Sequence, residues 1–120
     1  LRGYTLRGEE VRPGDIVQVT LFWETDQQLE QRYKVFLHLL DQQGQLVAQR
    51  DSEPGGGLAL TTTWEAGEPV VDNHGVLVSP ALAPGAYRLV LGLYDIADPN
   101  SRLPLVDGTD AYLLATITVR

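Results

Sequence analysis

The chain has 120 residues, the size of one domain, and 43% of them are apolar, enough to bury a core without disulfide or metal cross-links. It has no cysteine, which excludes disulfides, thiolate metal sites and cysteine nucleophiles. Its 16 acidic residues against 9 basic ones give a formal charge of -7, which argues against nucleic acid and anionic membrane surfaces as partners.

Short runs of alternating apolar and polar residues recur along the chain, and no window shows a helical stripe. A first edge strand is expected at 3–7 and a second strand at 16–24. In the second strand, alternate positions form one apolar face. These positions are Val17, Val19, Leu21 and Trp23. A third strand at 33–41 is joined to a fourth at 46–51 by a tight turn that contains Gly44.

The longest irregular stretch follows, from Asp51 to Gly67, and contains Pro54 and the glycine triplet 55–57. Long loops in compact domains are uncommon and often functional, which makes this loop the first place to look for a site. The next strand is expected at 69–78.

The segment from Leu82 through Gly85 to Tyr87 has the pattern of a tyrosine corner, in which a phenol at the start of a strand bonds back to the preceding loop. The strand that begins there is expected to run to Asp95. A turn at 95–101 and a short piece at 102–106 come next.

The last strand is expected at 112–119, with one apolar side. That side comprises Leu113, Ala115, Ile117 and Val119. Seven to nine short strands at near-regular spacing predict an all-β fold, a two-sheet antiparallel β-sandwich that is Ig-like or jelly-roll-like.

Several motifs also occur in a characteristic order. They are Tyr33 to Asp41, Gly44, Leu46 to Asp51, Pro54, Gly57, Thr63-Trp64 with Gly67-Glu68, Asp72, the Leu82 to Tyr87 corner, Gly92-Leu93-Tyr94-Asp95 and Arg102-Leu103-Pro104. In this order they resemble the β-sandwich domain at the C-terminal end of bacterial multi-spanning glycosyltransferases of the protein-mannosyltransferase-like type. The resemblance covers nearly the whole chain.

The resemblance implies a non-catalytic accessory domain, displayed on the extracytoplasmic side of the bacterial membrane and carried by a membrane enzyme. Residues 1–120 are then a single domain cut from a longer protein, with the parent's membrane domain as a partner and no cofactor. The acidic catalytic residues of such enzymes belong to the membrane portion. The domain is expected to recognise glycan or acceptor, and the alternative is a structural or protein-interaction module with no small-molecule ligand. No apolar run reaches the ~20 residues of a membrane-spanning helix, so no direct insertion by this segment is expected.

A sugar site is one reading of the aromatic residues. Trp64 with Tyr94 or Tyr112 offers a stacking platform, and nearby polar side chains offer hydrogen bonds to hydroxyls. These polar residues are Asp51, Asp72 and Asn73. The alternative reading, which aromatic packing habits favour, is that Trp64 plugs the open end of the sandwich beneath the glycine loop.

The sequence gives weaker evidence for a metal site or for catalysis than for a sugar site. His38 and His74 would need a further ligand to bind zinc, and each is expected on a partly exposed strand face. Calcium candidates follow the long strand but fit no spaced calcium-loop pattern, so turn chemistry is favoured. They are Asp95, Asp98 and Asn100. No serine lies in a Gly-x-Ser-x-Gly elbow, and paired carboxylates have no defining spacing, so an enzymatic role is not predicted.

Overall fold

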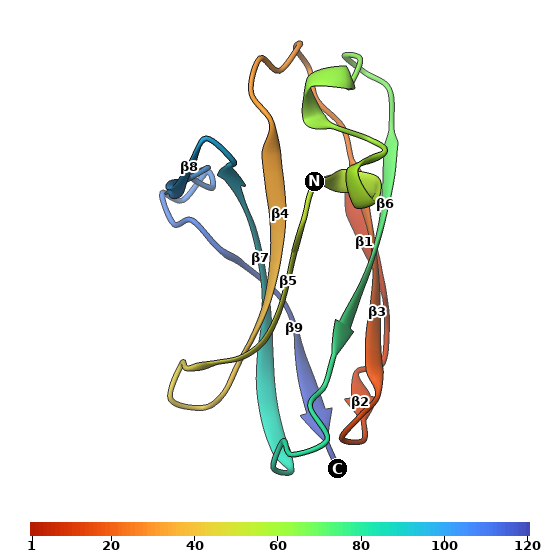
Figure 1. Ribbon diagram of the computed structural model, residues 1–120, viewed down its shortest axis with the longest axis vertical. Helices are drawn as coiled ribbons and strands as arrows, with labels where there is room; N and C mark the ends of the chain where they lie inside the picture. Colours follow the sequence, from red (N-terminus) through yellow and green to blue (C-terminus); the bar gives the residue numbers. More distant parts are fainter.

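The computed structural model describes residues 1–120 and is an all-β sandwich of two sheets, which confirms the predicted fold class. The smaller sheet has the strand order β1-β3-β6, and the larger has β2-β9-β7-β4-β5, with β8 paired to the end of β7. Figure 1 shows them as two facing layers, with β1, β3 and β6 in one and β4, β7, β5 and β9 in the other. The elements are β1 (Gly3–Arg7), β2 (Glu10–Val11), β3 (Ile16–Trp23), β4 (Tyr33–Leu40), β5 (Leu46–Ser52), η1 (Pro54–Gly57), η2 (Thr61–Thr63), β6 (Val70–Leu77), β7 (Gly85–Asp95), β8 (Asp98–Arg102) and β9 (Tyr112–Val119).

The strand order is Ig-like. β1-β3-β6 corresponds to strands A, B and E of an immunoglobulin-type sandwich, and β9-β7-β4 corresponds to G, F and C. The pairs are antiparallel except for the short β2, which runs parallel to β9 and was not expected from the sequence. Two residues of β2 carry too little alternation to signal a strand.

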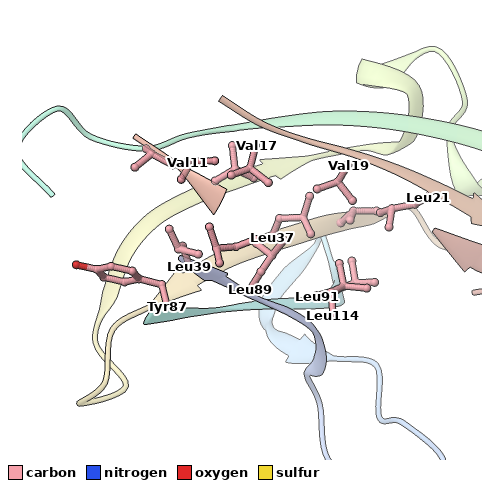
Figure 2. Packing of buried hydrophobic residues seen from close by; sticks show 14 of the residues in the cluster. Val11, Val17, Val19, Leu21, Leu37, Leu39, Tyr87, Leu89, Leu91 and Leu114 are labelled. Carbon is pink, nitrogen blue, oxygen red and sulfur yellow. The ribbon is translucent and has the colours of Figure 1, made fainter. Parts of the chain in front are cut away.

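The core lies between the sheets and is built from the inward positions of facing strands (Figure 2). β3 alternates strictly, with Val17, Val19, Leu21 and Trp23 all at most 5% exposed. This is the apolar face that the sequence predicted, and Leu37, Leu39, Leu89 and Leu91 oppose it from the other sheet. Burial of such side chains contributes roughly 1.5–3 kcal/mol each, which makes this layer the main source of stability.

The tyrosine corner is confirmed. The Tyr87 hydroxyl donates a 2.7 Å hydrogen bond to the carbonyl oxygen of Ala83, four residues upstream. Only 5% of Tyr87 is exposed, so its ring packs in the core while the hydroxyl fixes the turn before β7. In Figure 2 the phenol oxygen points out of the apolar cluster, as this role requires.

The turn predicted over 95–101 is too long, and the short piece predicted at 102–106 is mostly loop. A two-residue turn at Ile96–Ala97 follows β7, and the next strand is β8 at Asp98–Arg102. The Asp95 carboxylate accepts a hydrogen bond from the Ala97 amide at 2.9 Å and closes this turn early. Pro99 is tolerated because β8 pairs only with β7 and leaves an edge whose amide hydrogens need no partner.

The predicted apolar side of the last strand is only partly right. The register of β7 against β9 shifts between Leu89 and Val90, because Leu89 opposes Ala115 while Val90 opposes Leu113. Leu114 is the extra residue of this β-bulge and is buried, whereas Leu113 is 51% exposed. A bulge reverses the faces of the residues before it, and strict alternation cannot anticipate it.

Candidate functional site

A cleft of about 650 Å³ lies at one end of the sandwich. The first residues of the chain form one wall and an arm forms the other, where the arm is β8 together with the loop 103–111 that leads to β9. Trp23 and the end of β7, Leu91 to Leu93, also line it. Nine of its fourteen lining residues are apolar, a composition typical of ligand sites.

Two tyrosines give the cleft exposed aromatic surface. Tyr4 is 41% exposed and Tyr112 is 46% exposed, and both line the cleft. The Tyr4 hydroxyl donates a 2.9 Å hydrogen bond to the carbonyl oxygen of Leu114, which ties β1 to the bulge of β9 across the open side of the sandwich. Of these two rings, the sequence singled out only Tyr112.

The cleft also carries one basic and one acidic side chain. Arg2 is paired with Glu24 at 3.2 Å and remains largely exposed. Asp107 accepts hydrogen bonds from the side chain and the backbone of Thr109, and these bonds lower the pKa of its carboxyl below the usual value. Its carboxylate is therefore charged at neutral pH, with one oxygen free to accept hydrogen bonds.

The arm is held against the outer face of the larger sheet. The Arg102 guanidinium lies 4.4 Å from the centre of the Phe36 ring and pairs with Asp110 at 3.5 Å. Phe36 is 1% exposed although it points away from the main core. Gly92 must be glycine here, since a Cβ would fall inside the Phe36 ring and close to the Asp110 carbonyl oxygen.

Trp64, the residue on which the predicted sugar platform rested, is 6% exposed. Its ring lies 6.1 Å from the Trp23 ring, and its Nε1 donates a 2.8 Å hydrogen bond to the carbonyl oxygen of Ala59. A ring buried in this way has no free face for a ligand. The observed arrangement is the plug, with the η1 and η2 turns folded over one end of the sandwich (Figure 1).

Asp72 is fully buried and accepts three hydrogen bonds. The donors are Trp23 Nε1 at 3.1 Å, His74 Nε2 at 2.6 Å and the Gly55 amide at 2.8 Å. We call these groups the Asp72 network. Its carboxylate joins β3, β6 and the glycine turn, so it is not available to a ligand.

His74 is buried, which corrects the expectation of a partly exposed residue. It lies two positions from Asp72 on the same inward face of β6, where the carboxylate compensates for its burial. Arg50 Nε approaches His74 Nδ1 at 3.4 Å from the edge strand of the other sheet. These partners assign the tautomer with the proton on Nε2.

Asp51 and Tyr94 are brought together on the outer face of the larger sheet. The Tyr94 hydroxyl donates to Asp51 Oδ2 at 3.0 Å, and His38 Nε2 lies 3.2 Å from Asp51 Oδ1. Tyr94 and His38 also flank the Phe36 ring, with centroids 6.4 and 4.6 Å away. Both oxygens of Asp51 are thus engaged within the chain, and the cluster secures the Phe36 pocket rather than offering a free carboxylate.

This cluster predicts a specific alkaline sensitivity. Desolvation and the hydrogen bond to Asp51 raise the pKa of Tyr94 above its usual 10.0. Because the folded pKa is raised, the stabilisation is complete below pH 10 and is lost as pH rises through the folded pKa. Denaturant unfolding should be measured from about pH 8 to about pH 11, a range that includes the usual pKa of a tyrosine. The difference in the free energy of unfolding between wild type and Tyr94→Phe should become smaller at the high end of this range. A difference that stays constant over this range would contradict the assignment.

Asn73 lies apart from the other predicted ligand residues. It is exposed on the outer face of the smaller sheet, where its Oδ1 accepts a 2.7 Å hydrogen bond from Thr20. The structure therefore scatters the predicted site over three places: the core for Trp64 and Asp72, the outer face of the larger sheet for Asp51 and Tyr94, and the smaller sheet for Asn73.

The calcium candidates lie at the turn between β7 and β8. Asp95 caps the Ala97 amide, and Asp98 accepts from the Asn100 amide at 3.3 Å. These are the local bonds of ordinary turns. No group of three or more histidine, cysteine or acidic side chains is arranged to hold a metal ion.

Comparison with protein-family models and with curated proteins finds no match for this chain. The structure contains no helix of the length and apolarity that crossing a bilayer requires.

Proposed function

We propose that this domain is a non-catalytic recognition module that binds a glycan or acceptor in the cleft. In this proposal it serves a membrane glycosyltransferase-like parent outside the cytoplasm, as the sequence resemblance implies. The observation that carries the binding role is the presence of two half-exposed tyrosine rings beside charged side chains in one apolar cleft. The rings of Tyr4 and Tyr112 stack on the apolar face of a sugar, while Arg2 and Asp107 bond to its hydroxyls.

The arrangement of titratable groups supports binding rather than catalysis. The closest acid–base constellations, Asp72 with His74 and Asp51 with His38, are each saturated by hydrogen bonds from their own fold. Neither lines the cleft. The cleft itself presents no second carboxylate beside Asp107 that would serve as an acid–base pair.

The test is a two-dimensional amide NMR titration with a panel of mono- and oligosaccharides, with and without calcium. Shifts concentrated on β1, the arm and the start of β9 would support the proposal. Calcium-dependent shifts confined to Asp95, Asp98 and Asn100 would instead support a calcium site at the turn between β7 and β8. A spectrum unmoved by every sugar would overturn the glycan proposal.

Tyr112→Ala is expected to weaken sugar binding about two- to tenfold, because the loss of one stacking ring removes roughly 0.5–1.5 kcal/mol. The melting temperature of the Tyr112→Ala variant should differ little from that of the wild type, since nearly half of the Tyr112 side chain is exposed. Leu113→Ala is the matched control, because Leu113 is the neighbouring residue, is similarly exposed and does not line the cleft. Equal losses in both variants would remove Tyr112 from the site.

The second candidate function, a structural or protein-interaction module, is favoured by a different surface. The outer face of the β1-β3-β6 sheet is covered by no other element and exposes several large apolar side chains.

A further inference from the structure

The outer face of the smaller sheet is nearly free of charge. Its outward positions alternate with the buried core positions of the same strands. They are Gly3, Thr5 and Arg7 on β1, Ile16, Gln18, Thr20 and Phe22 on β3, and Val71, Asn73, Gly75 and Leu77 on β6. Arg7 is the only charged residue among them, in a chain with 25 Lys, Arg, Asp and Glu residues (9 basic plus 16 acidic).

This composition is that of an interface rather than of ordinary surface. Interface cores lack Lys, Glu and Asp and retain aromatic residues and Arg, and this face fits each of these tendencies. Ile16, Val71 and Leu77 are 56%, 56% and 58% exposed, although each is large and aliphatic. Aliphatic side chains in this number offer little to a sugar, whose recognition needs aromatic faces and planar polar groups, so they favour a protein partner.

Polar and apolar groups are distributed so that this face can match the same face of a second copy, with apolar groups against apolar groups and polar groups against polar groups. Ile16 and Leu77 oppose each other at one end, and Phe22 and Val71 oppose each other at the other end. Between them lie amide and hydroxyl groups, with Thr20 bonded to Asn73. Amides donate and accept equally well, so two such centres can bond to one another.

We propose that this face binds a second copy of the same chain, sheet against sheet, about a two-fold axis. With strands antiparallel across the interface, the Ile16 and Leu77 end of one copy packs on the Phe22 and Val71 end of the other. The amides of the two copies then meet at the centre. Each copy carries a formal charge of -7, and this face lets two copies approach without bringing their acidic residues together.

The size of the face sets the expected strength. β3 and β6 have eight residues each and β1 has five. At ~3.3 Å per residue and ~4.8 Å between strands, the face is therefore at most about 26 by 14 Å, or about 370 Å² per copy. A stable dimer buries about 800 Å² per partner, so this one is weak and concentration-dependent. The proposal does not depend on glycan binding, because the cleft and this face share only Gly3.

Sedimentation velocity and small-angle scattering on the domain test the proposal. We expect monomer at about 20 µM and a growing dimer fraction towards about 1 mM, in the range where weak complexes dissociate. Added salt should strengthen the dimer by screening the repulsion between the two acidic copies. The monomer measures 43 × 24 × 23 Å, so face-to-face stacking should about double one of its two short dimensions and raise the radius of gyration above 14.6 Å.

Val71→Lys should abolish the dimer while leaving the melting temperature almost unchanged, because the side chain is exposed at an edge strand. Leu77→Lys, on the same strand, provides a second disruption should the first variant fold poorly. Leu113→Lys adds the same charge at an exposed strand position of the other sheet and should leave the dimer intact. A chain that is monomeric across the whole range, or a dimer that survives both β6 variants, would overturn the proposal. Sugar-induced shifts on this face in a strictly monomeric chain would also overturn the proposal, and would indicate that the face binds a glycan.

Discussion

Replacing Asp72 with alanine is expected to destabilise the domain by about 3–5 kcal/mol, the cost of breaking a buried, hydrogen-bonded network by removing one partner. Three donors lose their acceptor at once: the buried Trp23 Nε1 and His74 Nε2, and the partly buried Gly55 amide. An unsatisfied buried donor costs about 1–3 kcal/mol. Asp72 is fully buried, so in the folded chain its partners rely on the carboxylate and not on bulk solvent. Domains of this size are stable by only about 5–15 kcal/mol, so the variant should be close to its folding limit.

Urea unfolding followed by circular dichroism measures this effect without relying on the fluorescence of Trp23, which is itself a partner. Asn73→Ala is the matched control, because Asn73 is the next residue on β6 and its side chain is exposed. Its substitution should cost no more than about 0.5–1.5 kcal/mol, the net value of a typical hydrogen bond. If the Asp72 variant lost no more than the control, the carboxylate would have no structural role and its place in a ligand site would need to be reconsidered.

Much of the fold was predictable because strand periodicity and turn chemistry are local. The alternation over β3 identified its buried face, since the strand pairs without interruption on both sides. The Pro84-Gly85 corner and Tyr87 identified the start of β7, because a tyrosine corner is formed within one short segment. The prediction that failed, the apolar side of β9, depends on a non-local feature. The bulge at Leu114 follows from pairing with β7, and no pattern within β9 indicates it.

The candidate site was much less predictable, because its parts come from opposite ends of the chain. Tyr4 lies on the first strand, while Tyr112 begins the last strand and Asp107 belongs to the preceding loop. Only the packing of the two sheets against each other and the fold-back of the arm bring them to one cleft. A usable signal was the presence of Tyr4 on an edge strand, since a large aromatic residue there is often left partly exposed.

The burial of Asp72 and His74 was not predicted from the sequence, and the reason is again non-local. Asp72 and His74 share one face of β6 by simple alternation, which the sequence does show. Which face is inward was ambiguous, because Val71 is as apolar as a core residue and yet is 56% exposed. The buried position of Asp72 becomes intelligible only when Trp23 and the Gly55 amide arrive from other parts of the chain.

Trp64→Ala is expected to cost about 3–5 kcal/mol of stability, as truncation of large aromatic residues in cores does. The indole is 6% exposed and packs on Trp23, so its removal leaves a cavity beneath the η1 and η2 turns. The Ala59 carbonyl oxygen also loses its donor. Thermal and denaturant unfolding measure the loss, and Trp64→Phe separates its causes, because phenylalanine refills most of the cavity and forfeits mainly the hydrogen bond.

The same variant distinguishes a packing role from a binding role for this residue. Sugar-induced shifts in the cleft should persist in Trp64→Ala at a temperature where it remains folded, since Trp64 does not line the cleft. The opposite pattern, full stability together with lost sugar binding, would restore the stacking platform and would require the loop over Trp64 to open in solution. The deep burial of the ring and its bond to Ala59 argue against such opening, because both interactions would have to be broken before any ligand reached the indole.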